Sequence, residues 1–202
     1  PETLAPTGLY LEPQGVNYAK HQSAYYLAPS DLLNPSGGYG GFAKNSSNKV
    51  QFYTNNFTPV NGGNIVVSYW AKLRPDAEIN SISHLKPYRW NSSVGAAPGY
   101  YVDLSNGTLY NATLNGGATA GAQTAENTTI TPYPNGWYRI THKITTDSTW
   151  TSDANFAFYQ YNGGHTNARH DVHYYWGFQV EHGDYATSYI PAVFDSTSAI
   201  TR

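Results

Sequence analysis

The stretch that decides the fold spans residues 176–191 and reads Trp176-Gly177-Phe178-Gln179-Val180-Glu181-His182-Gly183-Asp184-Tyr185-Ala186-Thr187-Ser188-Tyr189-Ile190-Pro191. With the residues just before it, this stretch predicts a β-strand over 172–182, then a sharp turn and a short extended exit. Strict alternation places one set of side chains on an apolar face and the other set on a mixed polar and aromatic face. The apolar set is Tyr174, Trp176, Phe178 and Val180, and the mixed set is His173, Tyr175, Gly177, Gln179 and Glu181. Such a strand is typical of a sandwich, with one face in the core and one able to meet a ligand.

Strand patterns recur between turn clusters along the rest of the chain. We expect strands near 8–12, 49–58, 64–73, 79–90, 99–104, 107–113, 136–146, 154–161 and 172–182, with a further strand pattern at 128–131. Helix signals are almost absent, since residues 28–34 suit only one turn before Pro35 ends it. The turn at 105–107 predicts a type I′ hairpin. Strands of this number and spacing predict an all-β chain, an antiparallel β-sandwich of jelly-roll type.

Composition limits the classes of protein that remain. A chain of 202 residues has the size of one all-β sandwich, so we expect a single domain over 8–202 behind a linker or extended arm over 1–7. The absence of cysteine excludes disulfides, thiol catalysis and cysteine zinc sites. A formal net charge of -2 with 12% charged residues gives no nucleic-acid footprint. No apolar run is long enough to predict membrane insertion.

Aromatic side chains beside polar partners are the main candidates for a ligand site. The chain is rich in tyrosine and glycine, with 19 of each, and also in Asn, Ser and Thr, a composition that recognition surfaces share with ordinary β-proteins. Sugars stack their apolar C–H faces on such rings and need planar polar groups for their hydroxyls. The alternative for each ring is a place in the core or at its edge. The candidate ligand-binding residues are Tyr88, Arg89, Trp90, Trp150, Tyr161, His165, Arg169, His173 and Tyr175.

The sequence gives weaker evidence for a metal site or for catalysis than for a ligand site. His165, His170 and His173 lie close together, but a spacing of three residues on a strand points two of them to opposite faces, so we do not expect zinc. No cofactor is required, although a structural calcium ion stays open, with oxygen donors such as Glu12, Asp103 and Asp184. The 13 acidic residues form no recognised catalytic pair, and no nucleophile elbow, P-loop or dinucleotide motif is present. We therefore expect no enzyme, while a glycan hydrolase or lyase with carboxylates that meet across a sheet stays open.

Four segments match, in order, the pattern of one known family. The pattern W-G-x-Q-x-E-x-G followed by T-S-Y-I-P is met over 176–191. The other three segments are 8–14 with Asn17, 67–72 and 135–139, which reads N-G-W-Y-R. The chain thus resembles the jelly-roll, carbohydrate-binding-module-like (concanavalin-like) domain of bacteriophage tail fibres, tailspikes and other virion proteins, and of some bacterial surface proteins.

The resemblance implies an extracellular virion protein on a phage tail or capsid surface. The function it implies is non-catalytic recognition of a host surface glycan, polysaccharide or lipopolysaccharide, as a receptor-binding tail-fibre domain. It also implies a homotrimer with other virion proteins as partners. The alternative is a structural virion module, for capsid decoration or tail assembly, without a sugar ligand. The framework positions are Trp137, Trp176, Gln179, Glu181 and Tyr189, where Gln179 and Glu181 either hydrogen-bond a neighbouring segment or bind hydroxyls.

Overall fold

The computed structural model describes a little over half of the chain. The described residues are 16–17, 19–21, 25–27, 31–38, 42–44, 49–54, 60–75, 84–91, 95–98, 100–111, 127–146, 154–161, 173–190 and 200–201. Side chains are described for 31–38, 60–75, 102–109, 127–146 and 173–190. The expected arm over 1–7 and the expected strand over 8–12 lie outside these ranges.

The described chain is all-β, and its strands form antiparallel sheets. A six-stranded sheet, here called the β6 sheet, has the order β11 (Thr128–Tyr133), β12 (Trp137–Thr145), β6 (Asn64–Leu73), β14 (His173–His182), β4 (Phe42–Lys44), β3 (Tyr25–Leu27). A seven-stranded sheet, the β13 sheet, has the order β10 (Thr108–Asn111), β9 (Tyr100–Asp103), β7 (His84–Asn91), β13 (Ala154–Tyr161), β5 (Lys49–Thr54), β2 (Ala19–His21), with β8 (Gly95–Pro98) also paired to β7. The all-β expectation is confirmed.

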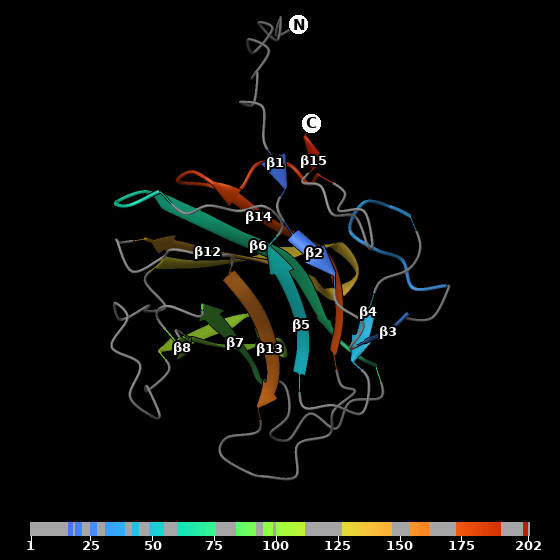
Figure 1. Ribbon diagram of the computed structural model, residues 1–202. Coiled ribbons are helices and arrows are strands. Elements are labelled where there is room, and N and C mark those ends of the chain that lie inside the picture. Colours follow the sequence, from blue (N-terminus) through green and yellow to red (C-terminus); the bar gives the residue numbers. More distant parts are fainter. Residues whose placement is uncertain are drawn as a thin grey trace, which may run out of the picture.

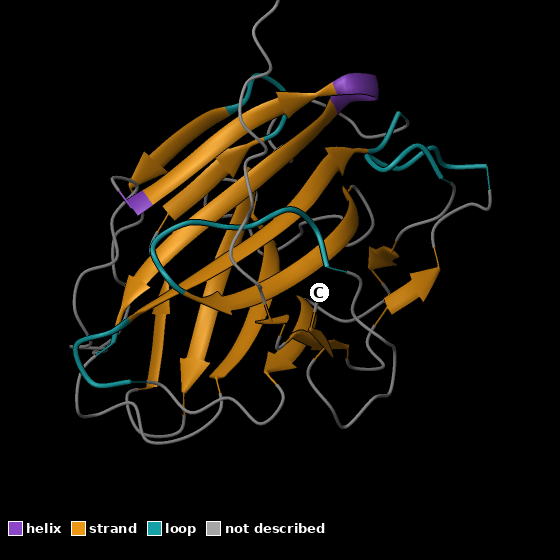
Figure 2. Ribbon diagram, turned by 90° about the horizontal axis from the view of Figure 1, so that it is seen from above, coloured by secondary structure: helices purple, strands orange, loops and turns teal. Residues whose placement is uncertain are grey.

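Figure 1 shows β14, β6 and β12 side by side, with β5, β13 and β7 in a separate group of strands. A short pair, β1 (Val16–Asn17) with β15 (Ile200–Thr201), joins two segments that are far apart in the sequence. Figure 2 shows that nearly all the described secondary structure is strand. Within the described residues no helix is long and apolar enough to cross a membrane.

Strand β6 is the centre of the molecule because it is buried on both faces. Every residue from Ile65 to Ala71 is buried. Alternate side chains of β6 enter the main core cluster, together with Ile140 and Ile144 of β12 and Val102 of β9. Because Val102 belongs to the β13 sheet, the two sheets contact one another at this cluster. Trp70 points to the opposite face and joins a second, aromatic cluster.

A β-bulge in β14 changes which of its residues share a face. Trp176 pairs with Trp70 and Gln179 with Ser68, so two residues of β14 lie opposite one residue of β6. The bulge contains Gly177, whose φ of 64° is the left-handed conformation that glycine tolerates. A Cβ at Gly177 would lie 2.7 Å from Cε3 of Trp70. The extra residue reverses the alternation, and Tyr175, Phe178 and Val180 all enter the main core cluster.

The expected faces of β14 were therefore wrong. Tyr174 and Trp176 pack in the aromatic cluster on the outer face of the β6 sheet rather than with Phe178 and Val180. Strict alternation fails here because a residue inserted into a strand moves every later side chain to the other face.

The hairpin between β9 and β10 is present, but its turn is not type I′. Thr108 pairs with Asp103, which leaves four residues, 104–107, in the loop. Among these only Gly107 has a positive φ, of 71°, whereas a type I′ turn needs two such residues in succession. Asp103 closes the loop by accepting hydrogen bonds from the Ser105 backbone N–H at 2.9 Å and from the Ser105 hydroxyl at 2.6 Å.

The described part of the expected helical turn is not helical. Residues 31–38 form turns and bends around a single β-bridge residue, Leu33. Asn34 organises this segment, since its side-chain oxygen accepts from the backbone N–H of Ser36 at 3.0 Å and from the Ser36 hydroxyl at 2.6 Å. A local side-chain hydrogen bond of this kind competes with helix formation.

Candidate functional site

A buried hydrogen-bond network holds the exit segment, residues 184–190, against β14. Oε2 of Glu181 accepts from Nε2 of Gln179 at 2.5 Å and from the Thr187 backbone N–H at 3.1 Å. The Thr187 hydroxyl donates to Oε1 of Glu181 at 2.5 Å, and the Ile190 backbone N–H donates to Oε1 of Gln179 at 2.7 Å. Gln179 and Glu181 are both buried. These bonds agree with the structural interpretation of the two side chains and leave neither open to an external ligand.

An aromatic cluster lies under the exit segment on the outer face of the β6 sheet. Trp70, Trp137 and Tyr174 form its buried part, and Trp176 and Tyr189 pack against them. The Trp176 and Tyr189 ring centroids are 4.3 Å apart. Nε1 of Trp137 donates to the backbone oxygen of Leu33 at 2.9 Å, which anchors the 31–38 segment to the same face. This cluster therefore contains three of the expected framework residues, Trp137, Trp176 and Tyr189.

Beside the exit segment, the outer face of β11 and β12 is open and forms a groove of about 470 Å³. We call it the β11–β12 groove. Its lining residues are Asn127, Thr129, Thr131, Tyr133, Arg139, Thr141, Lys143, Asp184, Tyr185 and Ala186. Of these residues, only Asp184 is a candidate from the sequence, and there only as a possible calcium donor.

The floor of the groove follows directly from strand geometry. Thr129, Thr131 and Tyr133 alternate along β11, and Arg139, Thr141 and Lys143 alternate along β12. The register pairs Thr129 with Thr141 and Thr131 with Arg139, so hydroxyls and charges lie in adjacent rows. The intervening residues of β12, such as Ile140 and Ile144, are buried in the main core.

The wall of the groove is the start of the exit segment, residues 184–186. Tyr185 stands there with 57% of its surface exposed, a large ring at the edge of a polar floor. Its position depends on the Gln179 and Glu181 network, because that network fixes the residues that follow it.

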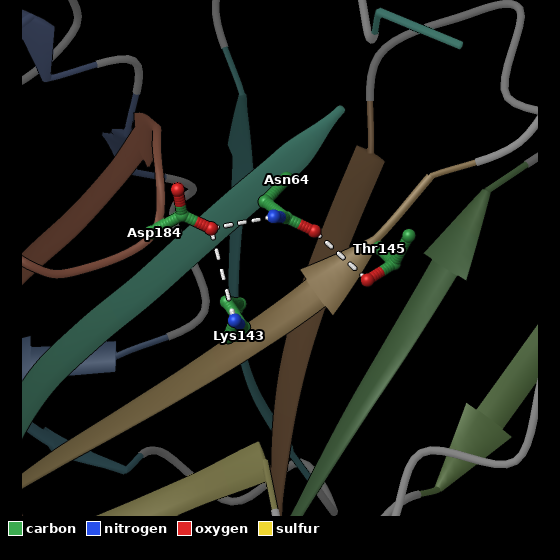
Figure 3. A network of polar contacts seen from close by, with 4 residues as sticks. All are labelled: Asn64, Lys143, Thr145 and Asp184. Carbon is green, nitrogen blue, oxygen red and sulfur yellow. Dashed lines mark hydrogen bonds and ion pairs between the residues drawn. The ribbon is translucent and has the colours of Figure 1, made fainter. Parts of the chain in front are cut away.

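One end of the groove carries a polar network, drawn in Figure 3. Oδ1 of Asp184 accepts from Nδ2 of Asn64 at 2.6 Å and lies 3.7 Å from Nζ of Lys143. The Thr145 hydroxyl donates to Oδ1 of Asn64 at 2.8 Å. Figure 3 shows that both contacts of Asp184 reach the same carboxylate oxygen and that its second oxygen points away from them.

The other end of the groove carries Arg139, whose guanidinium is held from two sides. Its Nη2 donates to the backbone oxygen of Thr187 at 2.6 Å. The guanidinium carbon lies 4.6 Å from the centroid of the Trp70 ring, a cation–π contact. Arg139 therefore links the aromatic cluster, the exit segment and the groove.

The candidate ligand residues of β14 lie elsewhere than expected. His173 and Tyr175 are fully buried, so the prediction that they line an exposed polar face was wrong. The bulge at Gly177 explains the error, because it puts Tyr175 beside Phe178 in the core, with ring centroids 6.1 Å apart. Burial raises the pKa of the Tyr175 phenol far above its ordinary value.

The remaining candidate ligand residues belong to the β13 sheet or lie outside the described residues. Tyr88, Arg89 and Trp90 are in β7, where they pair with Ala157, Phe156 and Asn155 of β13, and Tyr161 of β13 pairs with His84. The structure thus brings this group into two neighbouring strands. Trp150, His165 and Arg169 lie outside the described residues.

The described residues contain no group of three or more histidine and acidic side chains close enough to hold a metal ion. Of the expected calcium donors, Asp103 caps its own turn and Asp184 contacts Asn64 and Lys143. Glu12 is not among the described residues, so a structural calcium ion stays open. His165 and His170, which were weighed for zinc, also lie outside the described residues.

No protein-family model matches the chain. No curated protein is similar enough to it to count as a relative.

Proposed function

We propose that this chain is a non-catalytic carbohydrate-binding domain and that its ligand lies in the β11–β12 groove. The observation that carries the proposal is the lining of that groove, in which threonine hydroxyls, an amide and charged groups surround an open floor next to an exposed tyrosine. Sugar hydroxyls pair with such groups, and the apolar face of a sugar ring packs on tyrosine.

The shape of the groove suits an extended ligand. The floor runs along two neighbouring strands, and from Thr129 to Tyr133 it extends about 13 Å at the usual rise per strand residue. Among the described lining residues, those of the exit segment, 184–186, form a wall on one side of this floor. A polysaccharide chain can therefore lie along the strands without having to present a free end.

The acidic content of the groove supports binding rather than hydrolysis. Glycoside hydrolysis generally needs two carboxyl groups on opposite sides of the scissile bond. Asp184 is the one acidic residue among the described lining residues, and its Oδ1 is already engaged by Asn64. The proposal therefore assigns no catalytic residue.

The wider setting of the proposal comes from the sequence resemblance. We propose a phage virion domain, extracellular on the tail or capsid surface, in which a jelly-roll sandwich built from the β6 and β13 sheets presents the groove to the host. The proposed partners are a bacterial surface polysaccharide or lipopolysaccharide glycan and other virion proteins. A homotrimer would repeat a weak site and raise its effective affinity.

The test is a glycan array and a host-cell binding assay with the intact chain and two variants of Tyr185. Tyr185→Ala removes the ring from the groove wall, whereas Tyr185→Phe keeps the ring and removes only the hydroxyl. Loss of one aromatic ring contact should weaken binding by about tenfold, or about 1.4 kcal/mol. We expect that loss with alanine and near wild-type binding with phenylalanine.

Two results would count against the proposal. Equal binding by wild type and Tyr185→Ala would place the glycan outside the groove. Absence of binding to every glycan and host cell by the assembled protein would favour the structural virion module instead.

A further inference from the structure

The charges of the β11–β12 groove point to a particular class of sugar, an inference that rests on the function proposed above. Two cationic residues, Arg139 and Lys143, line the groove against one anionic residue, Asp184. The described lining residues thus carry a local excess of one positive charge in a chain whose formal net charge is -2. A positive patch on a chain of opposite overall sign attracts anionic ligands.

Arg139 presents a positive charge that is fixed in place before any ligand arrives. The Thr187 carbonyl holds one of its nitrogens, and the Trp70 ring lies against its guanidinium. Its Nε is buried, so the donors left for a ligand are those on the part of the guanidinium that lines the groove. A guanidinium carries five N–H donors, and its fork matches the two oxygens of a carboxylate. The part of Arg139 that reaches the groove can therefore complete its hydrogen bonding with an acidic ligand.

Lys143 supplies the second cation, and its own ion pair is weak. Its Nζ lies 3.7 Å from Oδ1 of Asp184, and the side chains of the two residues are 41% and 68% exposed. Exposed pairs of this kind contribute little, and Asp184 takes its shorter contact from Asn64 instead, at 2.6 Å. The Lys143 ammonium can thus turn to a ligand carboxylate at small cost.

The two cations lie on the same face of the same strand. Lys143 lies four positions after Arg139, which places the two residues about 13 Å apart along β12. Thr141 lies between them and pairs with Thr129, so hydroxyl groups fill the interval. A sugar chain lying along β12 would meet a cation at each end and neutral hydrogen-bonding groups in the middle.

We propose that the β11–β12 groove selects acidic saccharides, whose sugar carboxylates pair with Arg139 and Lys143. Neutral stretches of the same chain would lie over the threonines. The wall tyrosine, Tyr185, would pack on a sugar ring regardless of its charge, so charge selection and ring packing belong to different residues.

The experiment compares acidic glycans with their neutral counterparts on the intact protein. The probes are trigalacturonate, a hyaluronan tetrasaccharide and sialyllactose, each beside the same glycan with its carboxylates methyl-esterified. Calorimetric affinities are measured from low to high sodium chloride. We expect at least one acidic probe to bind about tenfold more tightly than its ester at low salt, and this preference to shrink as salt screens the charges.

Lys143 provides the matched variants, because it is partly exposed and its replacement does not touch the core. Lys143→Gln removes the charge and should reduce the preference for the acidic probe about fivefold, the size typical of one solvent-accessible ion pair. Lys143→Arg keeps the charge and should retain the preference. Both variants should bind the ester equally.

The outcomes separate this inference from the proposed function. If esters, or neutral glycans on the array, bind as tightly as the acidic probes and Tyr185→Ala weakens both, the groove binds sugars but acid selection is overturned. An acidic preference that persists unchanged in Lys143→Gln would overturn the role of Lys143 in it. If no probe and no array glycan binds at all, the proposed function fails together with this inference.

Discussion

At the scale of single residues, Gly177 determines how β14 is arranged. Its φ of 64° allows the bulge, and the absence of a Cβ lets Trp70 approach the backbone. Any other residue here would combine backbone strain with a steric clash. The glycine of the W-G-x-Q pattern is thus required by local geometry.

Replacement of this glycine should be costly. Gly177→Ala should lower the free energy of unfolding by about 2 kcal/mol or more, since strain and overpacking each contribute roughly 1–3 kcal/mol. Denaturant unfolding curves measure the change. Gly38→Ala is the control, because the nearest atom to its Cβ would be at an ordinary 3.5 Å. Equal stability of the two variants would contradict the role given to Gly177.

Tyr175 makes the free energy of unfolding depend on pH in the alkaline range. Burial raises the pKa of its phenol far above the ordinary 10.0, so the folded state keeps the proton at a pH where the unfolded chain has lost it. The stabilising contribution is complete below pH 10 and decreases as pH rises beyond it. The decrease from this residue approaches about 1.4 kcal/mol per pH unit.

Tyr175→Phe should remove that part of the pH dependence. Unfolding free energies of wild type and variant, measured from pH 8 to pH 11.5, should shift relative to one another in favour of the variant above pH 10, because the wild type loses stability faster as pH rises. Parallel pH curves would show that the Tyr175 phenol ionises as readily in the folded state as in the unfolded chain.

At the scale of elements, the exit segment is held by buried hydrogen bonds rather than by strand pairing. Glu181 accepts two hydrogen bonds from Thr187 and one from Gln179. Glu181→Gln would place an amide N–H₂ group where only acceptors fit. We expect a loss of about 1–3 kcal/mol and faster amide exchange over 184–190, measured by hydrogen-exchange mass spectrometry.

Asp184→Asn is the comparison for that variant, because it makes the same acid-to-amide change at an exposed site. Its expected cost is under about 1 kcal/mol, with exchange over 184–190 close to wild type. If Glu181→Gln left exchange in the exit segment unchanged, the network would not be what holds it.

A comparison of the predicted and observed strands shows which features the sequence alone can predict. Strands 64–73 and 154–161 were predicted with their observed bounds, because strong β-patterns end at clear turn residues. The faces of β14 were not, because a bulge depends on a tertiary contact between Gly177 and Trp70 that no local pattern contains. In β12, by contrast, simple alternation accounts for the inward side chains Ile140 and Ile144.

The groove was missed for a different reason. Thr129, Thr131 and Thr141 are ordinary strand formers, so their sequence carries no sign of a site. Their significance comes from the register of β11 on β12 and from the exit segment beside them. The available signal was the outward set Arg139, Thr141 and Lys143, which alternates with a buried set and places two charges and a hydroxyl on one face.

At the scale of the whole molecule, two regions compete as the binding surface. The sequence favours the aromatic residues of β7 and β13, whereas the described side chains favour the β11–β12 groove on the other sheet. The two regions belong to different sheets. A ligand bound to one of them will therefore change the chemical shifts of a different set of backbone amides than a ligand bound to the other.

The most direct test of the central claim is therefore a map of amide chemical shifts on the isotopically labelled, intact chain, titrated with the glycan that binds best on the array. We expect shifts that cluster at 127–133, 139–143 and 184–186 and that decrease in Tyr185→Ala. Shifts confined to 84–91 and 154–161, with the groove amides unmoved, would contradict it and return the binding site to the aromatic residues of the β13 sheet.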